Sequence, residues 1–129
     1  MIFVDTNYFL RFLLNDNSAQ HDIAKKLISN GAAGKYQLGA SVVVVFEIYW
    51  VLSSYYKKNK TEITNTLSNI LDLEFIYLPE RDILRNALAL FTKNNISLED
   101  CYNIFYAKVI KAVDFKTFDL ELANTIKKM

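Results

Sequence analysis

Short apolar runs alternate along the chain with longer segments whose apolar residues recur at helical spacing, and few folds accommodate such an alternation. Four runs have the length and composition of short buried strands: residues 2–4, 36–40, 75–78 and 115–117. Because the intervening helices carry the chain back across the sheet, such strands pair mainly in parallel. The sequence therefore predicts an α/β fold, a three-layer α/β/α sandwich with a short, mainly parallel central sheet.

The segments between these runs have the pattern of helices. The most ambiguous is 42–56, because its valines favour a strand, whereas the apolar run through Leu52 is longer than most buried strands. We expect a buried helix there, with burial overriding intrinsic propensity. The other predicted helices begin near Tyr8 and Thr61 and span 18–30, 81–94, 98–111 and 120–128.

Small polar residues and glycine predict where some of these helices begin and end. Thr6 or Asn7, then Ser18 and Ser97, are the expected N-terminal caps of three helices, because their side chains accept hydrogen bonds from free backbone N–H groups. The second helix should end at Gly31, since glycine readily adopts the left-handed conformation. Ile23, Leu27 and Ile28 are expected on its inner face.

Size and charge narrow the classes of function. At 129 residues, without a repeat or an interdomain linker, the chain is expected to form a single domain over 1–129. Its net charge of +1 gives no strong overall field, so a local patch would have to hold any nucleic-acid partner. The one cysteine suits a reducing compartment, and no segment has the pattern of a signal peptide or a bilayer-spanning helix. We expect a cytoplasmic protein with no membrane partner.

Four carboxylates occur in apolar surroundings where a solvated acid is unexpected: Asp5, Glu47, Asp100 and Asp119. An unpaired charge is costly to bury, so such groups are usually paired, protonated or bound to metal. Asp5 and Asp119 follow predicted strands, whereas Glu47 and Asp100 lie in the early turns of predicted helices. Both placements belong to the carboxyl edge of a parallel sheet, where ligands bind. We therefore expect the four acids to converge in one cleft.

Each acid also has a simpler explanation. Asp5 and Asp119 are able to cap the helices that follow them, and Asp100 stands three residues after Ser97 in a capping-box-like pair. Glu47 has no such role, because no basic residue lies one turn away. As a cluster, the carboxylates would repel one another unless a cation intervened, and an all-oxygen ligand set favours Mg²⁺ or Mn²⁺. Such a site activates water for phosphodiester hydrolysis.

Four sequence blocks resemble the PIN domain family, particularly the VapC-type toxins of bacterial and archaeal toxin–antitoxin pairs. The blocks are residues 2–7, Glu47 with 50–52, 98–100 with Ala107, and 117–119. The resemblance covers essentially the whole chain. Two features depart from the family pattern: the segment 112–116 lacks the usual glycine and aliphatic strand, and bulky residues follow Asp100 at 101, 102, 105 and 106.

The resemblance implies a Mg²⁺- or Mn²⁺-dependent ribonuclease that cleaves RNA, often forms a homodimer and is inhibited by an antitoxin protein. The implied catalytic and metal-binding residues are the four acids, Asp5, Glu47, Asp100 and Asp119. Thr6, Asn7 and Thr117 match supporting positions that orient carboxylates or bound water. The four acids would thus serve as a nuclease site in a PIN-like fold.

Further residues and two other classes of function stay open. Arg11 lies about one and a half helical turns beyond Asp5, where it could contact an RNA phosphate or pair with a neighbouring acid. Four aromatic residues could stack on bases or form a dimer surface, although core packing is the simpler role for the tryptophan: Tyr8, Trp50, Tyr55 and Tyr56. One alternative is a catalytically silent PIN-like module that binds RNA or a protein, which the bulky residues after Asp100 favour. Another is a phosphoacceptor signalling domain, although that class has an acidic pair after the first strand, whereas Thr6 follows Asp5 here.

Overall fold

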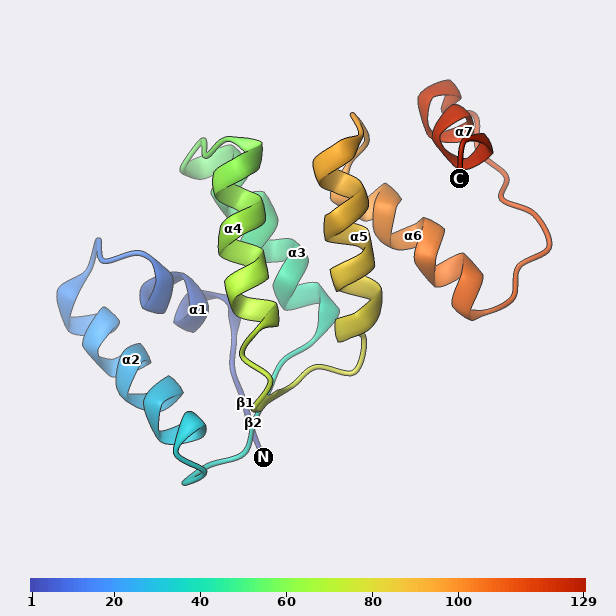
Figure 1. Ribbon diagram of the computed structural model, residues 1–129. Coiled ribbons are helices and arrows are strands. Elements are labelled where there is room, and N and C mark those ends of the chain that lie inside the picture. Colours follow the sequence, from blue (N-terminus) through green and yellow to red (C-terminus); the bar gives the residue numbers. More distant parts are fainter. The chain divides into compact units, whose positions relative to one another are not determined.

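The computed structural model describes residues 1–129 and confirms the α/β class, with seven α-helices and a small parallel sheet (Figure 1). The sheet has the strand order β1-β2-β3, and its strands are Ile2–Phe3, Leu38–Gly39 and Ile76–Tyr77. Both pairings are parallel, as predicted, and each strand is shorter than predicted. The chain forms two compact units, Met1–Glu80 and Arg81–Met129.

In the Met1–Glu80 unit, the carboxyl ends of two strands lead directly into helices. α1 (Thr6–Leu13) follows β1, and α3 (Val42–Trp50) follows β2. The backbone N–H of Val4 donates to Gly39 O at 2.8 Å, which extends the β1–β2 pairing up to the start of α1. α1 packs against both α2 (Ser18–Ala32) and α3, and α3 packs against α4 (Lys60–Leu71). The first turns of α1 and α3 therefore begin at the carboxyl edge of the sheet.

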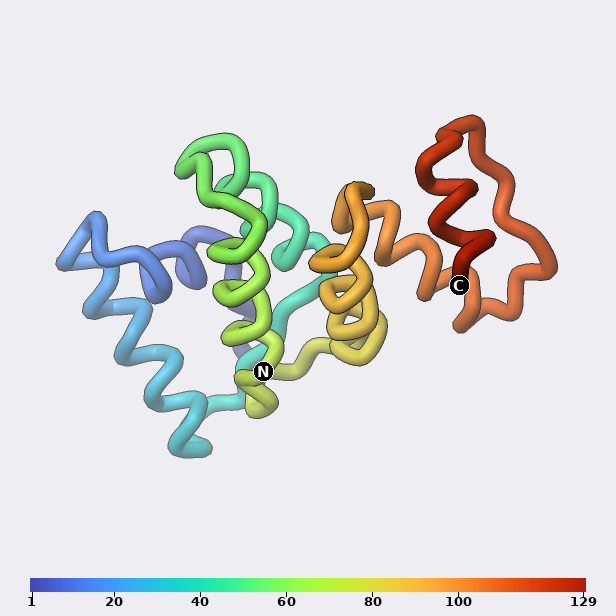
Figure 2. Tube along the Cα trace, turned by 45° about the horizontal axis from the view of Figure 1, so that its top comes forward, coloured from blue at the N-terminus to red at the C-terminus, as the bar shows by residue number.

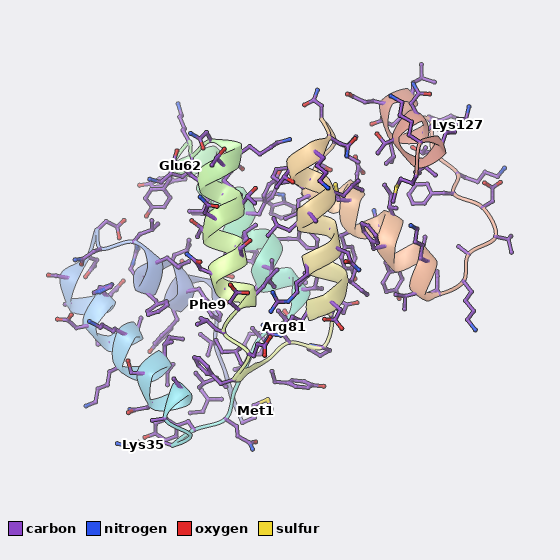
Figure 3. All side chains as sticks on the ribbon, viewed as in Figure 1. Met1, Phe9, Lys35, Glu62, Arg81 and Lys127 are labelled. Atoms are coloured by element: carbon purple, nitrogen blue, oxygen red, sulfur yellow. The ribbon has the colours of Figure 1, made fainter.

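The core of this unit lies between its helices and the sheet. Phe9 of α1 is buried in that core, whereas Glu62 lies at the start of α4, where it completes a capping box with Asn59 (Figure 3). Four apolar residues that recur at helical spacing in the sequence of α4 are all buried: Ile63, Leu67, Ile70 and Leu71. Helical spacing therefore located the buried face of α4 correctly.

The long apolar run is helical, as predicted. α3 continues into a π-helix, η1 (Val51–Tyr55), which ends one residue before the predicted boundary. The hydroxyl groups of Ser53 and Ser54 both donate to Trp50 O. Side-chain donors that compete for a backbone carbonyl in this way loosen the regular helical ladder, which accounts for the wider π turn.

The Arg81–Met129 unit consists of helices and loops: α5 (Arg81–Lys93), α6 (Leu98–Val109) and α7 (Leu120–Lys127). α5 packs against α6 through the buried residues of both helices. The buried residues are Leu84, Ala87, Leu88 and Phe91 of α5 and Leu98, Cys101 and Ile104 of α6. Ser97 caps α6 as predicted, because its Oγ accepts a hydrogen bond from Asp100 N at 3.1 Å.

The predicted fourth strand at 115–117 is wrong. Figure 2 shows the chain between α6 and α7 as an extended loop. Local hydrogen bonds hold the backbone there: Phe115 N donates to Asp114 Oδ1 at 2.8 Å, and Asp119 N donates to Thr117 Oγ1 at 3.0 Å. Such side-chain acceptors compete with a sheet ladder for backbone N–H groups. The neighbouring Phe118 is also fully exposed, so the segment buries no continuous apolar run.

Two predicted N-terminal caps are displaced by one residue or more. The N-terminal cap of α1 is Asp5, so Thr6 and Asn7 already belong to the helix. α2 is capped by Asn17 rather than by Ser18, and Asn17 Oδ1 accepts a hydrogen bond from the N–H of the third helical residue at 3.1 Å. In both cases the acceptor-bearing residue stands just before the residue chosen from the sequence, and the helix begins correspondingly earlier.

The predicted end and inner face of α2 also need correction. Gly31 lies inside the helix, and the left-handed residue after it is Gly34, with φ of +81°. A Cβ atom on Gly31 would lie 2.5 Å from Leu38 Cδ1, so glycine there permits close packing between α2 and β2. Ile23 is exposed, and Ala24 takes the core position next to it. None of the helices in the structure combines the length and the apolar character needed to span a membrane.

Candidate functional site

Asp5 stands where the first strand becomes the first helix. It is the N-terminal cap residue of α1, it is exposed, and its side chain makes no capping hydrogen bond. The simpler role considered for Asp5, helix capping by its carboxylate, is therefore absent from the structure. The carboxylate lies at the carboxyl edge of the parallel sheet, which is the edge where ligands bind in open α/β sheets.

Thr6, which follows Asp5, is the most unusual polar residue of this unit. Its side chain is 5 % exposed, and its Oγ1 has no hydrogen-bond partner within the protein. Buried hydroxyl groups are almost always hydrogen-bonded, so an orphaned one next to an exposed carboxylate calls for a water molecule or a ligand oxygen. Asn7 is exposed in the same first turn of α1.

Glu47 lies in the second turn of α3 and is half-buried. It shares a face of the helix with Val43 and Trp50, which are exposed, while the opposite face is in the core. The predicted buried helix is therefore present but is buried on one face only, and Glu47 lies on the less buried face. Because α1 and α3 pack against each other, the helices that carry Asp5 and Glu47 are neighbours.

Asp100 and Asp119 belong to the Arg81–Met129 unit. Asp100 is half-buried in the first turn of α6, and its backbone N–H, not its carboxylate, is bound by Ser97. Asp119 caps α7, because its Oδ1 accepts a hydrogen bond from Leu122 N at 3.0 Å. The Thr117 hydroxyl in turn accepts from Asp119 N at 3.0 Å, so Thr117 fixes the backbone that carries this acid. The capping role considered for Asp119 is confirmed.

The bulky residues that follow Asp100 in the sequence lie away from it on α6. The rings of Tyr102 and Tyr106 stack with their centroids 5.7 Å apart. In a helix these two residues are about 160° and 120° around the axis from Asp100, whereas Ala107 is about 20° away. Cys101 is fully buried in the core of this unit. The face of α6 that carries Asp100 therefore carries the small residue Ala107 about two turns on, and the two tyrosines lie on other faces of the helix.

The sequence-predicted acids are distributed over both units. Asp5 and Glu47 belong to Met1–Glu80, and Asp100 and Asp119 belong to Arg81–Met129. In neither unit do three or more His, Cys, Asp or Glu side chains gather closely enough to hold a metal ion. The convergence of all four acids in one cleft stays a prediction.

The donor chemistry of these residues fits a hard divalent cation. Carboxylate oxygens, together with the orphaned Thr6 hydroxyl, are the ligands and water-binding groups that Mg²⁺ and Mn²⁺ prefer. The softer donors of the chain are engaged elsewhere: Nδ1 of His21, the only histidine, donates to Arg11 O at 2.8 Å, and Cys101 is buried. A zinc-type set of histidine and cysteine is thus absent around these acids.

Arg11 is held in a network at the other end of α1. Its Nη1 lies 3.1 Å from Asp16 Oδ1, and its Nε donates to Gln20 Oε1 at 2.7 Å. The Tyr56 hydroxyl donates to the second Asp16 oxygen at 2.6 Å. This hydrogen bond, with the nearby guanidinium, holds the pKa of Asp16 below its ordinary value, and it raises the pKa of Tyr56. The ion pair that was one of the two roles considered for Arg11 is therefore present.

A pocket of about 360 Å³ opens between α1 and α2 beside this network. Its lining residues are Asn7, Tyr8, Arg11, Gln20, Ile23 and Ala24. Sequence reasoning selected Arg11 and Tyr8 individually but missed Gln20 and the pocket. The available signal was spacing: Asn7 and Arg11 lie one turn apart, as do Gln20 and Ala24. Two helices whose lining residues repeat one turn apart in this way present facing rows when they pack.

Comparison with protein families identifies the family to which this sequence is similar. The sequence model of the PIN domain family matches residues 2–128. The matched range runs through both units and includes every acid and supporting residue selected from the sequence. No curated protein matches the chain.

Proposed function

The chain belongs to the PIN domain family, and we propose from this premise that it is a Mg²⁺- or Mn²⁺-dependent endoribonuclease. PIN domains are generally nucleases, which act on nucleic acid and typically use divalent metal ions. The proposed reaction is the hydrolysis of an RNA phosphodiester bond. The finer proposal is that RNA is the substrate and that the four acids form the site. Its support is the placement and the donor chemistry of these residues.

The observation that carries this proposal is the pair Asp5–Thr6 at the end of β1. Asp5 presents an exposed carboxylate without a capping bond, and the adjacent Thr6 hydroxyl is buried without a partner. A catalytically silent module would gain nothing from an orphaned buried hydroxyl, because leaving it unpaired costs about 1–3 kcal/mol. The geometry fits a site in which these groups bind a cation and its water molecules.

The proposed roles follow from the placement of the acids. Asp5 and Asp119 are the direct ligands of the cation, and Glu47 and Asp100 complete the set or accept the proton of the attacking water. A bound divalent cation would lower the pKa of that water and neutralise charge developing on the phosphate. Thr117 is a positioning residue, since its hydroxyl holds the backbone of Asp119. Thr6 and Asn7 would hold water beside Asp5.

We also propose that the protein is the toxin of a toxin–antitoxin pair. The support is the order and spacing of the four sequence blocks, which resemble those of VapC-type toxins. On this proposal the chain acts in the cytoplasm as a homodimer, and an antitoxin protein blocks its cleft. Inhibition of RNA cleavage by a co-expressed neighbouring gene product would test this part separately from the chemistry.

The experiment that tests the nuclease proposal compares two Asp→Asn variants. Asp5→Asn removes the charge of a proposed ligand, and Asp22→Asn makes the same change at an exposed position of α2. Cleavage of single-stranded RNA is measured with Mn²⁺, Mg²⁺ or EDTA, and circular dichroism checks folding. We expect Asp5→Asn to lower the cleavage rate by about 100-fold or more, the scale of losing one catalytic group, while Asp22→Asn keeps the wild-type rate.

The outcomes separate the nuclease from the silent module. Full activity in Asp5→Asn, purified free of wild-type enzyme, would contradict the mechanism. Wild-type protein that binds RNA but cleaves none with either metal would favour the silent PIN-like module. The position of Tyr102 and Tyr106 away from Asp100 weakens that alternative, because these bulky residues were its main support.

A further inference from the structure

The pocket between α1 and α2 has the size and polar lining of a small-ligand site. Its volume of about 360 Å³ lies within the range of roughly 300–1,000 Å³ that is typical of such sites. Two of its lining residues, Asn7 and Tyr8, are in the first turn of α1, two and three residues after Asp5. A ligand in this pocket would therefore lie against the same helical turn that follows the proposed catalytic residue.

Arg11 provides a fixed group of hydrogen-bond donors in this pocket. A guanidinium has five N–H donors, of which one is donated to Gln20 and one to Asp16, and the guanidinium also interacts with the Tyr56 hydroxyl. Arg11 therefore keeps N–H donors beyond those that Gln20 and Asp16 occupy. Because two neighbours hold the guanidinium, and the Tyr56 hydroxyl holds Asp16 in turn, little side-chain freedom remains to be lost when a ligand binds.

The ion pair with Asp16 determines how Arg11 would recognise a ligand. The pair is nearly neutral at a distance, so Arg11 adds little long-range attraction to a chain whose net charge is +1. The remaining donors still form a planar fork, which matches two oxygen atoms of a phosphate. Geometry rather than net charge would thus select the ligand.

The other lining residues suit a base. Tyr8 exposes part of its ring and Ile23 most of its side chain, so the two provide an aromatic face and an apolar face. Gln20 Oε1 is occupied by Arg11, which leaves its NH₂ group as a donor, and the Asn7 amide has no partner within the protein. Aromatic stacking with nearby amide and guanidinium donors is the combination that binds unstacked bases of single-stranded nucleic acid.

We propose that this pocket is a subsite for one nucleotide of single-stranded RNA, adjacent to the phosphodiester that is cleaved. Arg11 binds a phosphate, Tyr8 stacks on the base, and Asn7 and Gln20 contact the base edge. The inference rests on the proposed nuclease function and adds where the substrate is held. It also requires a base to leave its stack, so single strands are bound in preference to duplexes.

The test is RNA binding by anisotropy in EDTA, where cleavage is suppressed, with a labelled random-sequence single-stranded RNA. Three variants are compared with wild type: Arg11→Gln, Tyr8→Leu and Lys25→Gln. Lys25 is exposed on α2 outside the pocket, so Lys25→Gln matches the charge change of Arg11→Gln. We expect Kd to rise about tenfold for Arg11→Gln, about fivefold or more for Tyr8→Leu, and less than about twofold for Lys25→Gln. Arg11→Lys, which keeps the charge but loses the fork, should bind nearly as weakly as Arg11→Gln.

The opposite results are equally clear. The subsite is overturned if Arg11→Gln and Tyr8→Leu bind RNA as Lys25→Gln does, or if wild type binds no RNA. Should Arg11→Gln fail to fold, Tyr8→Leu alone decides, because its side chain takes no part in the Arg11–Asp16 network. If the subsite is overturned but wild type cleaves RNA with Mn²⁺ and Asp5→Asn does not, the nuclease proposal stands and only the subsite fails. Absence of cleavage by wild type would overturn both.

Discussion

Two buried threonine hydroxyls lack a hydrogen-bond partner, and only one of them is next to a proposed catalytic acid. Thr6 follows Asp5 in α1, whereas Thr64 lies in α4, among residues with no proposed role in the site. Replacing either by valine exchanges the orphaned hydroxyl for a methyl group of similar size. Each change should therefore relieve about 1–3 kcal/mol of unpaired polar burial in the free protein.

The pair Thr6→Val and Thr64→Val separates a site role from a packing defect. Both variants should unfold at a temperature a few degrees above wild type in EDTA, since about 1 kcal/mol shifts the midpoint of such a domain by several degrees. Only Thr6→Val should lose RNA cleavage, by about tenfold, because it removes a group that supports the water around a metal. Thermal unfolding and a cleavage assay measure the two effects. Equal activity of the two variants would assign the Thr6 hydroxyl to packing alone.

At the scale of single residues, the sequence predicts the functional residues whose positions follow from local context. The position of Asp5 after a strand was predictable, because an apolar run and a helical pattern meet there. The role of Arg11 was only half predictable. Its partner Asp16 is close in sequence, but Gln20 meets it only because α1 packs on α2. Contacts between helices depend on packing that spacing alone does not specify.

At the scale of elements, prediction succeeded where one strong periodicity acted alone. α4 and α5 show their buried faces in the sequence, and the run 42–52 is helical because burial overrides the strand preference of its valines. The predicted strand at 115–117 failed for the opposite reason. Its few apolar residues compete with the side-chain acceptors of Asp114 and Thr117, and these local hydrogen bonds prevailed.

The network that joins the α1–α2 connection to the end of η1 makes stability depend on pH. The Tyr56 hydroxyl, followed by Arg11, lowers the pKa of Asp16 from its ordinary value of 3.8. A carboxyl whose pKa is lower in the folded state stabilises that state above its unfolded pKa, and the contribution is lost as pH falls through the lowered value. The hydrogen bond also raises the pKa of Tyr56 from its ordinary value of 10.0. The stabilisation from this bond is therefore fully present below pH 10.0 on the alkaline side, and it is lost as pH rises through the raised pKa of the folded state.

Tyr56→Phe should therefore lower the urea midpoint at pH 7 and have little effect once Asp16 is protonated, below its folded pKa. Tyr55→Phe is the matched control, because Tyr55 is an adjacent, largely exposed tyrosine. Urea unfolding of both variants at neutral and strongly acidic pH measures the difference. A deficit for Tyr56→Phe that is the same at both pH values would show that the ionised Asp16 is not the partner that matters.

At the scale of the whole molecule, the weak net charge limits how the proposed RNA substrate would be bound. A chain with a net charge of +1 does not concentrate RNA by its overall field, so on this proposal recognition would come from local donors and from a metal ion. The family match over residues 2–128 places the proposed acids of both compact units within one PIN sequence pattern. That pattern was recognisable from the order of four short blocks, whereas the convergence of the four acids in one cleft stays a prediction.

Thermal unfolding of the full chain with and without metal tests whether Asp119 belongs to a cation site. Asparagine is as good an N-terminal cap as aspartate, so Asp119→Asn preserves the start of α7 and removes only the charge. Mn²⁺ at about 100 times its Kd should add about 2.7 kcal/mol to the wild-type folded state. That gain corresponds to a midpoint increase of roughly 10 °C for a domain of this size. Asp22→Asn should respond as wild type does.

Asp119→Asn should respond to the metal far less than either, because one direct ligand is missing. In EDTA, however, it should unfold above the wild-type temperature, since removing one of several clustered carboxylates relieves repulsion. These two signs together distinguish a ligand from a structural cap. A purely structural Asp119 would give the same metal response as Asp22→Asn, and no gain in EDTA. That result would remove Asp119 from the proposed ligand set and leave its hydrogen bond to Leu122 as its whole role.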